Sequence, residues 1–140
     1  MLNVIETISA SPVLTTLRAA IQAAQWEERF SRQGLITVFA PTNEAFAKLP
    51  QGSLQEVFQH LPQVQEMLAY HFIEGAMLVA EITKYASLQT FQGKNVGIAV
   101  NNGIKVNQAN VISADIACEN GIIHILDAVL TMPNRKFTVA

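Results

Sequence analysis

The chain has 140 residues, of which 50% are hydrophobic and 14% are charged. This length fits one domain, and the high apolar share excludes intrinsic disorder. The formal net charge is -2 and the basic side chains form no stripe, so recognition of nucleic-acid phosphates is not expected.

The first predicted helix begins at Ser11 and Pro12, with Ser11 as the N-cap and Pro12 at the first helical position. Apolar residues then recur at three- and four-residue steps, which predicts one face packed on a core. That face consists of Val13, Leu14, Leu17, Ala20, Ile21 and Ala24. A buried strand is predicted over residues 35–39, a β-branched and aromatic run that Pro41 brings to an end.

Two further amphipathic helices are predicted in the middle of the chain. The first follows Gly52 and presents Leu54, Val57, Phe58 and Leu61 to the core. The second begins at Pro62 and ends at Gly75 as its C-cap. Its core face is formed by Val64, Met67, Leu68, His71 and Phe72.

From residue 86 onward the hydrophobic period changes from helical to two-residue. Strands are predicted over residues 88–92, 96–100, 104–106, 111–116 and 122–126. A tight hairpin is expected at residues 101–103 and a second turn at Asn120-Gly121, because Asn and Gly tolerate the positive φ of such turns. Helices first and sheet last predict an α+β fold.

The sequence carries none of the usual catalytic signatures, such as a phosphate-binding loop, a nucleophile elbow or H-E-x-x-H. His71 and Glu74 are three residues apart, but a metal site needs more convergent ligands. We interpret His71 as a buried imidazole that bonds a carbonyl near a helix end, and His124 as a cross-strand or surface residue. An enzyme that uses His71 or His124 is the alternative, although no partner residues are evident.

Cys118 is the only cysteine, so the chain forms no internal disulfide. The adjacent Glu119 disfavours the thiolate, and we expect an unreactive thiol. No apolar stretch approaches the roughly 20 residues of a membrane span. No secretory signal is visible after Met1, and no asparagine lies in an N-glycosylation sequon.

Two segments resemble the diagnostic motifs of the fasciclin family. Residues 37–46 resemble the first fasciclin box and residues 120–130 the second, while residues 68–73 look like the central Tyr-His motif. The order and spacing match over residues 3–133. The motif positions that we assign structural roles are Thr37, Val38, Phe39, Ala40, Pro41, Thr42, Asn43, Phe46, Gly121, His124, Asp127 and Leu130.

The resemblance implies a single fasciclin domain over residues 1–140, with N-terminal helices packed on a mostly antiparallel C-terminal sheet. It also implies a non-catalytic adhesion module, without cofactor or metal, that binds a protein or glycan at a cell surface or in the matrix. In animal members, integrin recognition is linked to the Tyr-His region and to a Glu-Pro-Asp-Ile-Met stretch, of which Asp115 and Ile116 match here. The candidate interaction residues are therefore Asp115, Ile116, Tyr70 and His71.

The family implies an extracellular or cell-surface location, and the absence of sequons fits a bacterial-type single-domain member. An intracellular interaction or stress-related scaffold is the alternative, because no signal peptide is visible and the one cysteine is unpaired. A cytoplasmic location would agree with that alternative.

A stability prediction follows from the position of His71 on an apolar face. We expect the imidazole to be buried and hydrogen-bonded, so His71→Ala should lower the free energy of unfolding by about 1–3 kcal/mol. Urea denaturation of the two proteins measures the difference. A change within experimental error would contradict the buried, hydrogen-bonded assignment.

Overall fold

The structure, a computed structural model, describes residues 2–26, 35–49, 52–100 and 102–130, without the side chains of residues 53 and 54. The helices are α1 (Val4–Ala10), α2 (Thr15–Ala23), α4 (Asn43–Ala47), α5 (Ser53–Phe58), α6 (Leu61–Ala69) and α7 (Val79–Ile82). The strands are β1 (Ile36–Pro41), β2 (Phe72–Glu74), β3 (Ser87–Gln89), β4 (Asn95–Val100), β5 (Ile104–Val106), β6 (Ala109–Cys118) and β7 (Gly121–Leu126).

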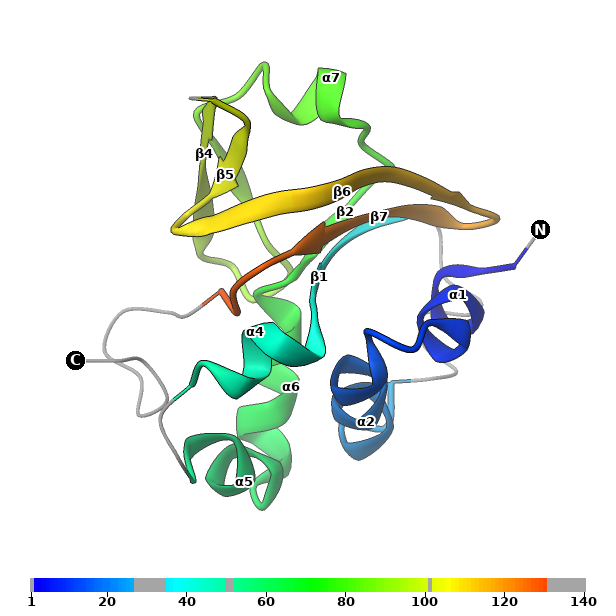
Figure 1. The fold of residues 1–140 in the computed structure, drawn as a ribbon, viewed down its shortest axis with the longest axis vertical. Coiled ribbons are helices and arrows are strands. Elements are labelled where there is room, and N and C mark those ends of the chain that lie inside the picture. Colours follow the sequence, from blue (N-terminus) through cyan, green and yellow to red (C-terminus); the bar gives the residue numbers. More distant parts are fainter. Residues whose placement is uncertain (1, 27–34, 50–51, 101, 131–140) are drawn as a thin grey trace.

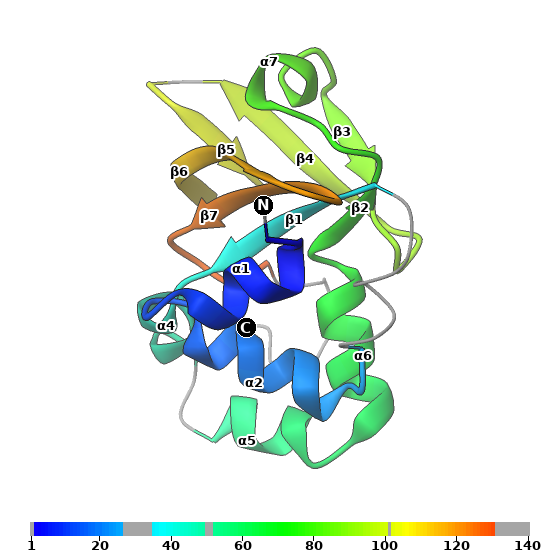
Figure 2. The ribbon, with the colours of Figure 1, turned by 90° about the vertical axis from the view of Figure 1, so that its right-hand side faces the viewer.

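Seven strands form one mixed sheet in the order β2-β1-β7-β6-β5-β4-β3. β1 and β7 run parallel, and every other neighbouring pair is antiparallel. Figure 1 shows α1, α2, α4, α5 and α6 on one side of β1 and β7, whereas β3–β5 and α7 lie on the other. Figure 2 shows the same two-layer arrangement from the side. The predicted α+β class and the mostly antiparallel sheet are confirmed.

The parallel pair of β1 and β7 lies at the centre of the structure. All six residues of β1 are buried, and β1 pairs in register with β7 from Ile36↔Gly121 to Pro41↔Leu126. A Cβ at Gly121 would collide with the Ile36 carbonyl oxygen. Gly121 does not have a positive φ and lies inside β7, so close strand approach, not the predicted turn geometry, requires glycine here. The turn itself consists of Glu119 and Asn120, between the paired Cys118 and Gly121.

The N-terminal helices differ from the prediction at their boundaries. α1 was not predicted, although Asn3 and Glu6 form a capping box in which each side chain accepts the other's backbone N–H at 2.8 and 2.9 Å. Ser11 is the C-cap of α1, not the N-cap of α2, and Pro12 lies in the turn between the two helices. α2 begins at Thr15, after Leu14 as its N-cap.

The predicted C-cap at Gly75 is also wrong. α6 ends at Ala69 with Tyr70 as its C-cap, and the next residues enter β2. His71 and Phe72 continue the apolar pattern of the helix because both side chains are buried. A short apolar run has no period that distinguishes a helix from a strand, so the pattern did not reveal the change to β2. Gly75, with φ of +91°, follows that strand.

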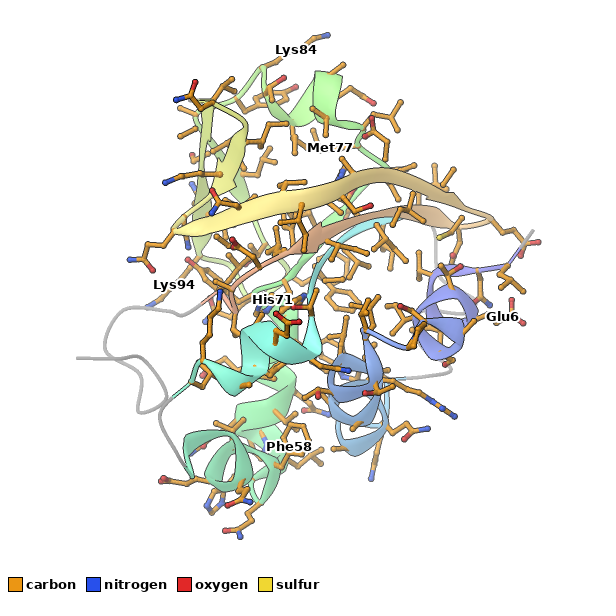
Figure 3. The ribbon with its side chains drawn as sticks, in the orientation of Figure 1. Glu6, Phe58, His71, Met77, Lys84 and Lys94 are labelled. Atoms are coloured by element: carbon orange, nitrogen blue, oxygen red, sulfur yellow. The ribbon has the colours of Figure 1, made fainter. Side chains whose placement is uncertain are left out.

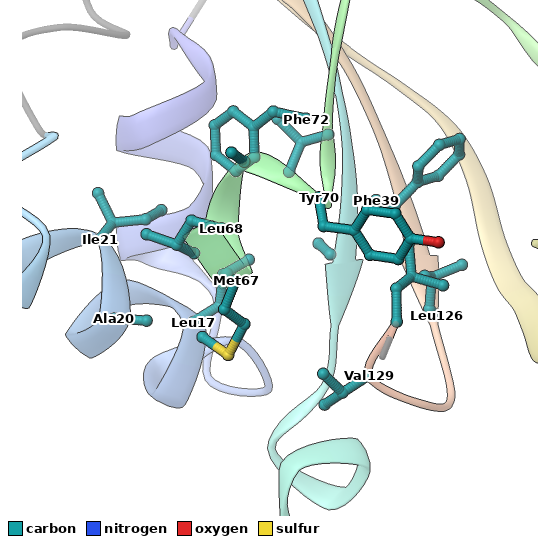
Figure 4. Close-up of a cluster of buried hydrophobic side chains, with 14 of the residues drawn as sticks. Leu17, Ala20, Ile21, Phe39, Met67, Leu68, Tyr70, Phe72, Leu126 and Val129 are labelled. Carbon is teal, nitrogen blue, oxygen red and sulfur yellow. The ribbon is translucent and has the colours of Figure 1, made fainter. Parts of the chain in front are cut away.

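The helical layer packs on the sheet through the faces that the sequence predicted, with two exceptions. Figure 4 shows Leu17, Ala20 and Ile21 of α2 next to Met67 and Leu68 of α6, while Phe39 of β1 and Leu126 of β7 lie on the far side of the strands. Within the predicted faces, Val13 is 47% exposed and Leu61 is 41% exposed. The predicted core side chain at Leu54 lies outside the described residues.

The β-rich half contains strands in each predicted region, but β3 ends at Gln89, short of the predicted 92, and burial does not alternate strictly along β6 and β7. β4 and β5 are antiparallel neighbours with Val100 opposite Ile104, which confirms the hairpin, although residue 101 lies outside the described residues. α7 was not predicted because it spans only four residues. The pairing of β6 with β7 shifts register between Val111 and Ser113, and again between Ser113 and Ile116. The predicted core limit of 133 lies beyond the last described residue.

A glycine substitution tests the central strand pair. Gly121→Ala should lower the free energy of unfolding by at least about 2 kcal/mol, because β1 must move away from the new methyl group. Gly97→Ala is the matched control, since a Cβ there meets only the Asn107 amide oxygen at 3.6 Å. Thermal or urea denaturation gives both values. Equal stability of the two variants would refute the claim that β1 and β7 need a glycine at this contact.

Candidate interaction site

The predicted interaction residues do not form one surface. Tyr70 and His71 are buried, with 3% and 1% of their surface exposed. Asp115 and Ile116 lie on β6, where Asp115 is exposed and Ile116 is partly buried opposite Ile123 of β7. In Figure 3, His71 lies between the sheet and the helices. Only Asp115 therefore presents its side chain freely to solvent.

His71 links three segments through main-chain hydrogen bonds. The Leu130 N–H donates to His71 Nε2 at 2.9 Å, so the proton is on Nδ1, which donates to the Met67 carbonyl oxygen at 2.8 Å. The His71 carbonyl in turn accepts the Phe39 N–H at 2.8 Å. Burial lowers the pKa of His71 to about 4, although the bond to Met67 opposes this change. The neutral imidazole thus joins α6 to the segment after β7, and the His71 main chain adds β1. The predicted hydrogen bond to a carbonyl near the helix end is present.

Tyr70 connects the helical layer to the β4–β5 hairpin. Its hydroxyl donates to the Asn95 carbonyl oxygen at 3.1 Å and accepts from Asn107 Nδ2 at 3.0 Å. The Asn107 amide oxygen also accepts the Gly97 N–H at 2.7 Å. The Tyr-His motif is therefore a pair of internal connections in this structure.

His124 belongs to a second network, on the other face of the sheet. It is fully buried, so the predicted surface position is wrong, whereas a cross-strand contact is present. The Asp115 N–H donates to His124 Nδ1 at 3.2 Å, which leaves the proton on Nε2, and Nε2 donates to the Met77 carbonyl oxygen at 2.8 Å. Figure 3 shows Met77 on the side of the sheet opposite α1 and α2. Burial lowers the pKa of His124, and the bond to Met77 and the charge of Asp115 oppose this.

The same network holds the segment between β2 and α7. The Thr37 hydroxyl donates to the Gly75 carbonyl oxygen at 2.6 Å and accepts the Met77 N–H at 2.8 Å. Asp115 Oδ1 accepts the Val79 N–H at 2.8 Å. Asp115 has φ of 59°, a left-handed conformation that Asp tolerates better than most residues. The Asp115 N–H thus donates to His124 while its carboxylate accepts from Val79, and the two bonds fix this exposed carboxylate at a position of β6 with positive φ.

Asp127 closes the end of the second motif. Its carboxylate accepts the Asn110 N–H at 2.7 Å and the Asn110 side-chain amide at 2.9 Å. Partial burial alone raises the pKa of Asp127, but the Asn110 bonds and the Lys48 charge outweigh it and lower the pKa. The Lys48 ammonium donates to the Asp127 carbonyl oxygen at 2.9 Å. Asp127 therefore holds β6 at Asn110 through its carboxylate and α4 at Lys48 through its main chain.

Cys118 is buried, and the predicted weak reactivity has a different cause. Burial raises the pKa of the Cys118 thiol, and a hydrogen bond from the thiol to the Thr7 hydroxyl at 3.4 Å partly opposes this. Desolvation, not the adjacent Glu119, is therefore what disfavours the thiolate.

Sequence reasoning missed a surface groove of about 520 Å³, which we call the β6–α4 groove. It is lined by Val13, Thr42, Asn43, Glu44, Ile112, Ser113 and Ile125. Val13 was expected in the core, and Ile112 is 57% exposed on β6. The sequence signal for this groove is weak, because its residues come from four separate segments.

The described residues contain no group of three or more His, Cys, Asp or Glu side chains arranged to hold a metal ion. Both ring nitrogens of His71 and of His124 are engaged by the main chain. In the part of the chain that the structure describes, no helix is long and apolar enough to cross a membrane.

The decisive geometry is the pairing of the two motif segments, because β1 and β7 are neighbouring strands. A family model described as "Fasciclin domain" matches residues 12–133. The chain belongs to the fasciclin family.

Its relatives include bacterial and animal proteins. The chain is 36% identical over 132 residues to the "Uncharacterized protein sll1735" of Synechocystis sp., covering 94% of this chain and 99% of that protein. It is 33% identical over 135 residues to the transforming growth factor-beta-induced protein ig-h3 of Sus scrofa, covering 96% of this chain and 20% of that protein. A solved FAS1 domain pair from the insect cell adhesion molecule Fasciclin I matches the fold with a TM-score of 0.78 and 17% identity, over 94% of this chain and 51% of that one.

Membership of the fasciclin family supports a non-catalytic interaction module. The polar networks of this fasciclin domain hold its segments in place, largely through hydrogen bonds to main-chain atoms. The surface that these networks leave available contains the Asp115 carboxylate and the β6–α4 groove.

The buried His71 predicts how stability changes with pH. The pKa of His71 is about 4 in the folded protein and 6.5 in the unfolded chain. The unfolded state therefore binds the proton more readily, so stability is complete above about pH 6.5 and falls as the pH approaches about 4. At 1.36 kcal/mol per pKa unit the loss is at most about 3 kcal/mol. His124 acts in the same direction.

Urea denaturation at several values between about pH 7 and pH 4 measures this dependence. His71→Gln should weaken the pH dependence, because its amide does not titrate. His60→Gln, at an exposed histidine, is the control and should keep the wild-type slope. An unchanged slope in His71→Gln would show that His71 does not titrate as its burial requires.

Proposed function

We propose that this chain acts as a single-domain, non-catalytic adhesion module that binds a protein or glycan at a cell surface or in the extracellular matrix. The observation that carries the proposal is the presentation of Asp115 in a fasciclin domain. Its side chain is 47% exposed, and its main chain is held by His124 from below. A carboxylate held in one orientation loses little conformational entropy when it meets a partner.

Ile116, Tyr70 and His71 have supporting roles in this proposal. Ile116 follows Asp115 in β6 and packs against the core opposite Ile123, so it supports the strand that carries the carboxylate. Tyr70 and His71 are buried and act indirectly, by keeping the hairpin and the segment after β7 in place. Substitution of either would reduce binding through loss of folding.

The test compares Asp115→Asn with wild type in attachment of the host's own cells to protein-coated surfaces. Asparagine keeps an acceptor for the Val79 N–H and tolerates the positive φ, so this variant removes charge and preserves the fold. We expect attachment to fall several-fold. Glu119→Gln removes the same charge from another exposed position and should attach normally.

Two outcomes would contradict the proposal at different levels. Equal attachment by Asp115→Asn and wild type would remove Asp115 from the contact. Failure of the wild-type protein to alter attachment or to bind any surface component of its host would remove the adhesion function itself. Cell fractionation with an antibody locates the untagged protein, and exclusive recovery from the cytoplasm would rule out the extracellular role.

A further inference from the structure

The β6–α4 groove exposes apolar side chains that the fold leaves uncovered. Val13 and Ile112 are 47% and 57% exposed, and Ile125 is partly buried between β6 and β1. These residues come from the α1–α2 turn, β6 and β7, so the groove depends on the tertiary structure. Its volume of about 520 Å³ lies in the range of natural ligand pockets. Contact with an apolar group would remove this surface from water.

The wall of the groove at the start of α4 is already ordered. Asn43 Oδ1 accepts the Thr16 N–H at 2.8 Å, and Asn43 Nδ2 donates to the Pro12 carbonyl oxygen at 3.2 Å. The Thr42 hydroxyl accepts the Ala45 N–H at 3.1 Å. Because these groups are satisfied within the domain, the wall need not rearrange when a partner binds.

Glu44 determines the charge of the groove. It carries the only charge among the seven lining residues, and its side chain is exposed. Within the described residues, the Glu44 carboxylate has no hydrogen bond or ion pair. Ser113, also exposed, places a hydroxyl on the opposite wall. The groove is therefore complementary to an apolar group that lies next to a cation.

The shape of β6 favours a side chain as the occupant over an added strand. β6 pairs with β5 only at Ala109 and Asn110, so its later residues have a sheet neighbour on one side only. Two register shifts interrupt that stretch. Such irregularities protect an edge strand against pairing with another chain. A partner segment therefore gains more from inserting a side chain into the groove than from extending the sheet.

We propose that the β6–α4 groove docks an extended segment of a protein partner. An apolar side chain of that segment packs between Val13 and Ile112, and an adjacent Lys or Arg pairs with Glu44. This inference rests on the proposed adhesion function and names its contact surface and the chemistry of its partner.

The experiment selects binders from a phage-displayed library of random peptides on the immobilised full-length protein. Enriched sequences should place Leu, Ile, Val or Phe next to Lys or Arg. A synthetic peptide of the enriched sequence is then titrated by fluorescence anisotropy. Ile112→Asp should weaken its affinity at least tenfold, and Val13→Asp should do the same from the opposite wall.

Charge and position are tested with matched variants. Glu44→Gln should weaken the affinity several-fold and reduce its dependence on salt, because the ion pair is lost. Val100→Asp is the control, since Val100 is 65% exposed on β4 and does not line the groove. It should bind like wild type. Circular dichroism verifies that each variant is folded.

Four results would overturn the inference, and the last of them concerns cell attachment. One is the absence of enriched peptides with apolar and basic neighbours, and another is wild-type affinity in both Ile112→Asp and Val13→Asp. The third is a concentration-dependent dimer, seen by analytical ultracentrifugation and lost in Ile112→Asp, which would assign the groove to a second copy. If Ile112→Asp still supports cell attachment like wild type, the groove proposal fails and the adhesion proposal stands.

Discussion

The close approach of β1 and β7 is the constraint on which the rest of this fold depends. The two strands run parallel, and the Ile36 carbonyl lies where a side chain at position 121 would otherwise be. Helices cover one face of the pair, while His124 and Thr37 reach from the other face to the segment before α7. The residues of the family motifs thus serve the pairing of β1 with β7. They specify a scaffold rather than a ligand.

The two buried histidines act as neutral connectors between main-chain segments. Each imidazole donates one hydrogen bond and accepts one, which matches a carbonyl on one side and an N–H on the other. His71 does this between α6 and the segment after β7, and His124 between β6 and Met77. A buried imidazole without these hydrogen-bond partners would lower the free energy of unfolding, so the stability of the fold depends on both histidines.

Local patterns in the sequence predicted much of this structure, and long-range contacts account for most of what they missed. The core face of α2 and the β4–β5 hairpin follow from spacing and turn chemistry within a few residues. The parallel pairing of β1 with β7 joins distant segments, and no local pattern encodes it. The β6–α4 groove was missed for the same reason. By contrast, α1 had a readable signal in the capping box of Asn3 and Glu6.

The position of β1 and β7 in the chain also affects how the protein folds. Every strand from β2 to β6 lies within the loop that their pairing closes, so this central contact carries the entropic cost of closing a long loop. Such non-local topologies fold slowly compared with helical bundles of similar size. The buried side chains of α2 and α6 need this sheet as their support. A nascent chain whose β7 has not yet left the ribosome therefore exposes an incomplete core. Pairing of β7 with β1 completes that core.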